Sequence, residues 1–242
     1  MIITRDTDAL LLAAVRDNAD WCDAVCRAQG VEGSVGADAW TSARRTPPLY
    51  PDAVSLSPTA AAAALVDPID TASPGCSVKD SFASLDLAPA GFEVLFEAQW
   101  IHRPAGPAPA AASRLEWSEV TGPEELEAWE AAWDGTESGG IFRPALLGED
   151  RAFLAGRAGG RIVAGAVVCF GAEVAGVSNL FARDPADTDA TWAGVLDAVA
   201  ARRPGLPVVG YEHGEDLDTA VRAGFVPLGP LRVWLHTGGE AN

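Results

Sequence analysis

Three adjacent residues with side chains that can move protons, Tyr211, Glu212 and His213, follow a short apolar segment in the C-terminal part of the chain. A phenol can donate a proton to a leaving group, and a carboxylate or an imidazole can accept one from an attacking amine. Neighbours on a strand point to opposite faces, so at most two of the three can share a pocket. We therefore predict Tyr211 as proton donor and Glu212 or His213 as proton acceptor. Core packing of Tyr211 and a surface turn at His213 are the alternatives.

Arg232 is a second candidate, because it stands between the apolar residues Leu231 and Val233 in an expected strand. Alternation places its side chain opposite theirs and on the same face as Trp234. A guanidinium there can pair with an acid across the sheet or bind a substrate carboxylate through two parallel hydrogen bonds. Arg232 and Trp234 are the predicted substrate pocket.

The stretch FARDPADTDATWAGVLDAV, residues 181–199, runs from an expected strand into an expected helix. Free N–H groups in the first turn of a helix often hold phosphate. Here the turn lacks glycine and carries Asp184, Asp187 and Asp189. At about 4 Å and an effective dielectric near 20, each like-charge contact costs on the order of 4 kcal/mol. We predict a poor phosphate site, with Thr188 or Asp189 capping the helix and the acids favoured by its positive end.

Composition narrows the class of protein. The chain has 242 residues, 48% of them hydrophobic, and a formal net charge of −17. An excess of acids disfavours binding to nucleic acid and to anionic membrane surfaces. No segment resembles a signal peptide or is long and apolar enough to span a bilayer. We expect a cytoplasmic protein that acts on a small molecule.

The four cysteines show no metal-binding spacing. Cys22 and Cys26 lie four residues apart on an expected helix, and the three histidines are scattered. A zinc site needs four ligands close together. We predict reduced, buried thiols and no metal.

The order of elements indicates a mixed α/β fold in two parts. A Pro/Ala-rich linker over 104–114 separates an N-terminal α/β lobe, 1–103, from a second lobe, 115–242. The first lobe opens with a helix over 7–30, which Asn18 and Asp20 may divide into two helices. The second lobe reads strand, helix, three antiparallel strands, helix, strand, helix, strand.

That order resembles the GNAT superfamily of N-acyltransferases over residues 115–236. The segment AGF-x-x-x-G-x-L-R-V-W-L at its end adds to the resemblance. By this resemblance, VSNLFA (177–182) is the central strand, and VVGYEHG is the next strand, which splays away to admit the pantetheine arm of acyl-CoA. Tyr211 matches the place of a tyrosine that reprotonates the leaving thiolate. The residues expected to contact the cofactor are Asn179, Phe181, Arg183 and Thr191.

The resemblance also implies a pyrophosphate cradle of the form Arg/Gln-x-x-Gly-x-Gly/Ala. Its positions fall near Ala186, Asp189 and Thr191, and none of the three fits. We therefore expect acyl transfer from acetyl-CoA or another acyl-CoA to a small amine, with binding of acyl-CoA weakened or lost. The alternative is a non-catalytic binding or interaction protein that keeps the fold.

A faint internal similarity links residues 85–102 to residues 216–236. Both read as a short helical segment, Ala-Gly-Phe and a strand with a tryptophan near its end. Duplication would make the N-terminal lobe a degraded, GNAT-like copy of the second, and chance similarity explains the pattern equally well. The resemblance also allows a homodimer formed by exchange of the last strand.

Overall fold

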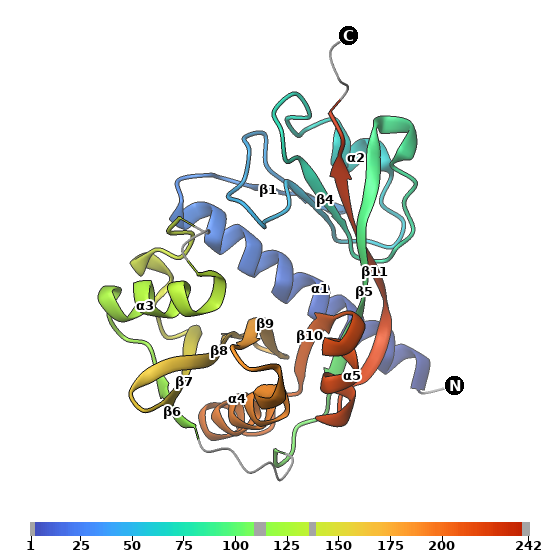
Figure 1. Ribbon diagram of the computed structural model, residues 1–242. Coiled ribbons are helices and arrows are strands. Elements are labelled where there is room, and N and C mark those ends of the chain that lie inside the picture. The colour runs from blue at the N-terminus through green and yellow to red at the C-terminus, as the bar shows by residue number, and fades with distance from the viewer. Residues whose placement is uncertain (1–2, 109–114, 136–138, 239–242) are drawn as a thin grey trace. The chain divides into compact units, whose positions relative to one another are not determined.

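The computed structural model describes residues 3–108, 115–135 and 139–238, and these form two compact units (Figure 1). The first unit comprises Met1–Gln99 and Gly229–Asn242, and the second comprises Trp100–Leu228. The last strand from Gly229 onward therefore packs with the first unit, whereas the sequence assigned all of 115–242 to one lobe. Residues 104–108 of the expected linker form no helix or strand, and 109–114 lie outside the described residues.

The first unit consists of a long helix, a short helix and a sheet. Its strand order is β1-β2-β3-β4-β11-β5, with β3 parallel to β4 and β4 antiparallel to β11. The helices are α1 (Ile3–Ala28) and α2 (Ala62–Val66). The strands are β1 (Ser34–Val35), β2 (Ala39–Thr41), β3 (Ala53–Ser55), β4 (Ser77–Asp80), β5 (Phe92–Arg103) and β11 (Val226–His236), and a short 3-10 helix, η1 (Ala88–Ala90), precedes β5.

Helix α1 is continuous, so the expected break at Asn18 and Asp20 was wrong. Asn18 is buried and its side-chain oxygen accepts a hydrogen bond from Lys79 Nζ at 2.6 Å. This tertiary contact satisfies an amide that would otherwise compete with the helix backbone for hydrogen bonds. The buried residues of the first unit include Trp40, Leu65 and Phe92, whose side chains are fully buried.

The second unit has the strand order β5-β10-β9-β8-β7-β6. Strands β7, β8 and β9 form the predicted antiparallel meander, and β10 runs parallel to β9. The strands are β6 (Glu116–Glu119), β7 (Arg151–Ala158), β8 (Arg161–Phe170), β9 (Ala175–Ala182) and β10 (Val208–Glu212). The helices are α3 (Pro123–Asp134), α4 (Thr188–Arg202) and α5 (Gly214–Arg222), with short 3-10 helices η2 (Pro144–Leu146) and η3 (Pro185–Asp187).

Helices cover both faces of this second sheet. On one face, α4 and α5 share a buried cluster with the strands, which includes the predicted inward residues Trp192, Val195, Leu196 and Val199. On the other face, α3 places Trp129 against Phe153 and Phe181, with ring centroids 5.1 and 5.3 Å apart. Gly165 of β8 makes this packing possible, since an added Cβ would lie 2.6 Å from Trp129 Nε1 and 2.7 Å from Phe181 Cε1.

Candidate functional site

Strands β9 and β10 separate at their carboxyl ends. Their register pairs Val208 with Ala175 and Val209 with Gly176, and no later pair is formed within the two described strands. Gly210 still lies near β9, because a Cβ there would be 3.0 Å from the Val177 carbonyl oxygen. Beyond that point, backbone groups of two neighbouring parallel strands face each other without a ladder. In open α/β sheets, this edge of diverging strands is where ligands bind.

A β-bulge in β9 borders this opening. Gly165 pairs with Phe181 and Val167 pairs with Ser178, so two residues of β9, Asn179 and Leu180, stand opposite one residue of β8. Asn179 adopts φ 52°, in the left-handed region that non-glycine residues seldom occupy. Bulges re-aim side chains and occur next to active sites. Here the bulge lets Leu180 pack towards α4 while Phe181 turns towards α3.

Tyr211 and Glu212 point to opposite faces of β10. The Tyr211 ring meets the Trp100 ring edge-on at 5.5 Å, whereas Val208, three residues earlier, belongs to the cluster under α4 and α5. Alternation along β10 therefore places Glu212 on the α4 and α5 face. His213 lies outside the strand, at the exposed N-cap position of α5, where its side chain forms no capping bond.

The half-buried carboxyl group of Glu212 has a raised pKa. Desolvation, with added repulsion from Asp216 of α5, raises the pKa of Glu212 to about 8. Burial disfavours the charged form of a carboxyl group, and a nearby like charge adds to the effect. A carboxyl group with such a pKa can exchange a proton near neutral pH, as a general acid or base must.

The turn between β9 and α4 bonds its own amide groups. Pro185 has no N–H, and the Ala186 N–H is donated to Asp184 Oδ1 at 3.0 Å. The Asp187 N–H bonds the Asp184 carbonyl at 2.9 Å, and the Thr188 N–H bonds the Pro185 carbonyl. The expected cap at Thr188 or Asp189 was wrong, because η3 precedes the helix and the capping carboxylate is that of Asp184.

The cofactor contacts expected at this turn are engaged within the protein. The buried Thr191 hydroxyl donates to the Asp187 carbonyl at 2.9 Å. Asp189 forms an ion pair with Arg222 of α5 at 3.0 Å, and both side chains are more than half exposed. Arg183 is exposed, and its backbone N–H bonds the Val163 carbonyl. A diphosphate needs free amides and cations; the amides of η3 and Arg222 are already engaged and Arg183 is the exposed cation beside three exposed acids, so the residues of this turn fit a diphosphate poorly.

Arg232 and Trp234 belong to the first unit. Arg232 donates from Nε and Nη2 to Glu97 Oε1 at 3.0 and 2.7 Å, and its guanidinium lies 5.4 Å from the centre of the Trp234 ring. Of the two alternatives for Arg232, the structure contains the ion pair across neighbouring strands. Trp234 itself is buried. The predicted substrate pocket is thus occupied by contacts within the chain.

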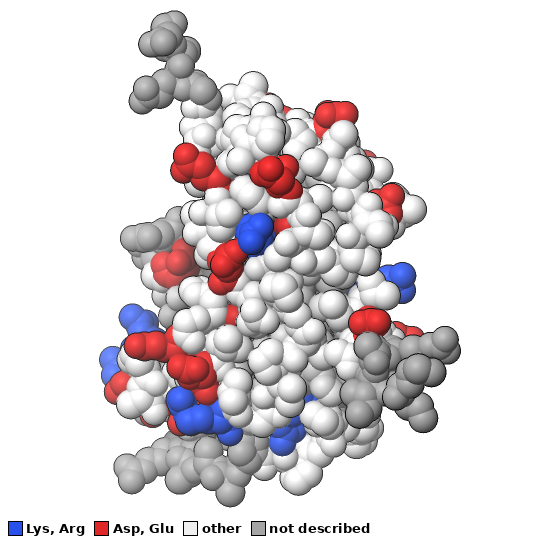
Figure 2. Space-filling model, turned by 90° about the vertical axis from the view of Figure 1, so that its right-hand side faces the viewer, with Lys and Arg blue, Asp and Glu red and all other residues white. Residues whose placement is uncertain are grey.

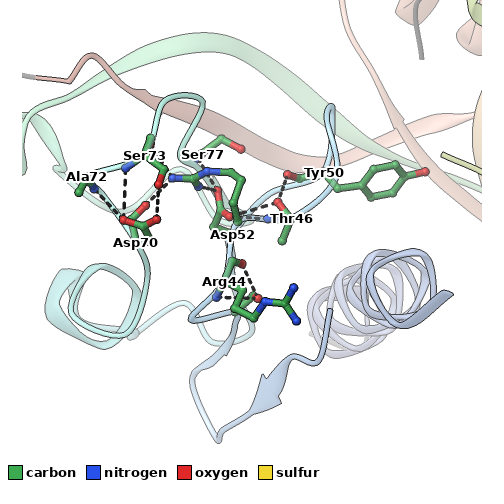
Figure 3. A network of polar contacts seen from close by, with 10 residues as sticks. Arg44, Thr46, Tyr50, Asp52, Asp70, Ala72, Ser73 and Ser77 are labelled. Atoms are coloured by element: carbon green, nitrogen blue, oxygen red, sulfur yellow. Dashed lines mark hydrogen bonds and ion pairs between the residues drawn. The ribbon is translucent and has the colours of Figure 1, made fainter. Parts of the chain in front are cut away.

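Sequence reasoning missed a cluster of polar residues around Asp52 in the first unit (Figure 3). Asp52 is almost fully buried and accepts hydrogen bonds from the Thr46 and Ser77 amides, both at 3.0 Å. It also pairs with Arg45, whose Nη2 bonds the Ser73 carbonyl at 2.8 Å. No local sequence pattern predicts these contacts, because the residues that bond Asp52 and Arg45 come from separate segments of the chain. The cluster ties two loops together.

Sequence reasoning also missed the role of Glu130 in the second unit. This buried carboxylate on α3 accepts N–H bonds from Gly140, Ile141 and Phe142 at 2.9, 2.7 and 3.0 Å. The loop after α3 is thereby fixed beside the aromatic cluster of Trp129, Trp133 and Phe142. Helical spacing places Glu130 on the same face as Leu126 and Trp133, and this was the available signal; a charged residue is nevertheless expected in solvent, and the packed loop explains its burial.

All four cysteines are free; Cys22, Cys26 and Cys76 are buried as predicted, whereas Cys169 is half-buried. Desolvation is the main cause that raises the pKa of Cys26 to about 12, so this group is an unreactive thiol. Among the described residues, His, Cys, Asp and Glu form no group of three that could hold a metal ion. None of the helices in the described ranges has the length and apolar character needed to cross a membrane.

Solved structures of GCN5-related N-acetyltransferases have the fold described above, so the predicted GNAT resemblance is confirmed for the fold. A GCN5-related N-acetyltransferase from Kribbella flavida aligns with 94% of this chain and 97% of its own, at a TM-score of 0.63 and 17% identity. An acetyltransferase of the GNAT family from Novosphingobium aromaticivorans aligns with 90% of this chain and 96% of its own, at a TM-score of 0.54 and 16% identity.

A GCN5-related N-acetyltransferase-like protein from Streptococcus suis aligns with 85% of this chain and 88% of its own, at a TM-score of 0.55 and 11% identity. No family model matches the sequence, and no curated protein matches it either. The alignments extend over the N-terminal part, whereas the resemblance in the sequence covered residues 115–236 and the internal similarity left open a GNAT-like copy in the N-terminal lobe. At these identities the likeness establishes the fold.

Proposed function

We propose that the second unit transfers an acyl group from a thioester to a small amine at the opening between β9 and β10. The observation that carries the proposal is the separation of these strands after Val209, beside the bulge at Asn179. After these residues, the two strands share no register pair, so an extended ligand can lie between them. The fold shared with acetyltransferases supports the same reaction class.

The two candidate proton carriers flank this opening on opposite faces of β10. In the proposed reaction, the amine nitrogen attacks the thioester carbonyl carbon, and its proton passes through water to the Glu212 carboxylate, which lies on the face of β10 opposite Tyr211. The C–S bond then breaks, and the thiolate takes a proton from the Tyr211 hydroxyl. An amide and a free thiol result, and one proton has moved from nitrogen to sulfur through the side chains and solvent. Positioned acid and base groups contribute about 10²–10⁴-fold in rate.

A Glu212→Gln variant tests this role. We expect transfer to a panel of small primary amines, followed by thiol release, to fall by about 10²-fold or more because the amide cannot accept the proton. The wild-type rate should rise with pH to a plateau governed by a pKa of about 8. Tyr211→Phe should lower the rate without moving that pKa. Glu215→Gln, at an exposed acid on the first turn of α5, is the control. An unchanged rate in Glu212→Gln would reject Glu212 as the base.

The bonded turn before α4 favours a second candidate function, a binding or interaction protein that keeps the fold without catalysis. Saturable binding of a thioester with no transfer to any amine would support it. Transfer that depends on Glu212 would exclude it. Acyl-CoA remains a candidate ligand of either function, with weakened affinity proposed from the residues of the turn.

We further propose a small molecule as ligand, rather than nucleic acid or a membrane surface. The net charge of −17 supports this choice. On the face in Figure 2, basic side chains occur singly or in small groups beside acidic ones, between broad uncharged areas. A polyanion is bound through a continuous row of basic groups. Retardation of duplex DNA at low salt would count against the proposal. A cytoplasmic location and a homodimer remain predictions.

A further inference from the structure

We infer that the acyl donor is a thioester whose carrier lacks a nucleotide diphosphate, such as an acylated pantetheine arm or a shorter thiol. The inference rests on the proposed acyl transfer and names its donor. It follows from a contrast inside the second unit: the turn before α4 bonds its own amides, while the opening between β9 and β10 remains without a ladder.

The turn has no amide to offer between Pro185 and Thr188. Proline lacks the N–H group, and the next three amides are donated to Asp184 Oδ1, the Asp184 carbonyl and the Pro185 carbonyl. A diphosphate bound at a helix N-terminus relies on such groups. A diphosphate that used the amides of Ala186, Asp187 or Thr188 would have to displace the hydrogen bonds of η3.

The charges of the turn also disfavour binding of a diphosphate. Asp184, Asp187 and Asp189 are exposed on the turn, against the one exposed cation Arg183 in its described residues 183–189. The nearest cation of α5, Arg222, is already paired with Asp189 and also donates to Thr219 Oγ1 at 3.0 Å. A diphosphate would compete with a carboxylate for this arginine and meet further carboxylates around it.

The opening between β9 and β10 suits an extended ligand without charge. A pantetheine arm carries two amide groups and no charge, so it can lie beside the extended backbone of β9 and β10 as an added strand does. The bulge at Asn179 and the close approach of Gly210 to Val177 shape this path. A thioester can therefore bind here through its pantetheine arm, without contacts to a phosphate.

The test compares donors of different length on the intact protein. The catalytic efficiency, kcat/KM, is measured with acetyl-CoA, S-acetylpantetheine and S-acetyl-N-acetylcysteamine and one primary amine. Calorimetry measures the binding of CoA, of pantetheine and of ADP, which has the diphosphate without the arm. We expect acetyl-CoA and S-acetylpantetheine to agree within about tenfold, CoA and pantetheine to bind equally, and ADP to give no heat, because the diphosphate adds no binding energy for catalysis to use.

A preference for acetyl-CoA above about tenfold, or saturable ADP binding that CoA displaces, would overturn the inference while leaving acyl transfer in place. Equal binding of CoA and pantetheine without transfer to any amine would support the binding mode and reject the proposed reaction. Absence of heat from all three binding ligands, without transfer, would overturn both.

Discussion

Two segments of the second unit use a carboxylate to bond backbone amides, and they differ in burial. Glu130 is buried and accepts the N–H groups of Gly140, Ile141 and Phe142. Asp184 is exposed and its side chain accepts the N–H of Ala186. In both, an acid of the chain occupies the place that an anionic ligand could take.

Burial decides what each carboxylate contributes. Because Glu130 and the Ile141 and Phe142 amides are buried, solvent has little access to replace the lost acceptor, so these amides depend on this side chain. At the turn, solvent can hydrate Asp184 and the amide alike, so the same kind of bond adds little stability. We infer that Glu130 mainly stabilises the fold, whereas Asp184 mainly determines what the turn can bind.

Glu130→Ala is the largest effect that this comparison predicts. The buried amides of Ile141 and Phe142 and the partly buried amide of Gly140 lose a charged acceptor, and each unsatisfied buried group costs about 1–3 kcal/mol, so the free energy of unfolding should fall by about 3 kcal/mol. Denaturant unfolding followed by tryptophan fluorescence measures it. Glu130→Gln, which keeps an acceptor oxygen, should cost less.

Glu127→Ala is the matched control, because Glu127 is exposed on the same helix. Its cost should stay within about 0.5 kcal/mol. If the two alanine variants were equally stable, the loop at 139–142 would not depend on the carboxylate, and the contrast with Asp184 would fail.

Much of this fold could be predicted from the sequence. Helical spacing placed Trp192, Val195, Leu196 and Val199 on the buried face of α4, and glycine turns marked the meander of β7, β8 and β9. The continuity of α1 could not be predicted, because it depends on a contact between Asn18 and Lys79 that are far apart in the chain. The membership of Gly229 onward in the first unit is a tertiary property of the same kind.

The candidate site could be predicted in outline only. Composition of the 181–199 segment indicated a poor phosphate turn, but the reason expected was charge repulsion, and the structure adds amides that are already bonded. The ion pair of Asp189 with Arg222 joins two helices, so no local pattern indicates it. The state of Glu212 likewise arises from burial and from Asp216, which only the packed helix α5 brings near.

Glu212 is a third carboxyl group for this comparison, and its surroundings keep it neutral. We expect its effect on the free energy of unfolding to be smaller than that of Glu130 and larger than that of Asp184. The pKa of Glu212 is raised from 4.5 to about 8, so the folded state binds more protons than the unfolded state between these values. The free energy of unfolding should therefore decrease as pH rises from about 4.5 to 8 and stay level above. For this half-buried group the change is about 1–2 kcal/mol once solvent screening is allowed for.

Unfolding of the wild type and Glu212→Gln across this pH range measures the effect. The variant should be the more stable one at pH 8 and should show a shallower decrease. Asp17 contributes a slope of the same sign, since desolvation and Asp20 raise its pKa to about 8, so the variant keeps part of the dependence. Identical profiles would show that Glu212 ionises freely in the folded protein.

The smallest effect on stability is expected at the turn itself, where the change in binding is the informative result. Asp184→Ala removes an exposed cap bond and should cost less than about 1 kcal/mol. Combined with Asp189→Asn, it frees the Ala186 amide and releases Arg222 for a phosphate oxygen, so the affinity for CoA should rise by about tenfold. Pantetheine should bind as before.

Asp197→Asn removes a charge from an exposed acid further along α4 and serves as the control for net charge. It should change the affinity for CoA by less than about twofold, because exposed charges beyond a Debye length of about 8 Å are largely screened at physiological salt. An equal gain in the control and the double variant would assign the weak binding to overall charge. A gain confined to the double variant would show that Asp184 and Asp189 exclude the diphosphate locally, as the comparison with Glu130 requires.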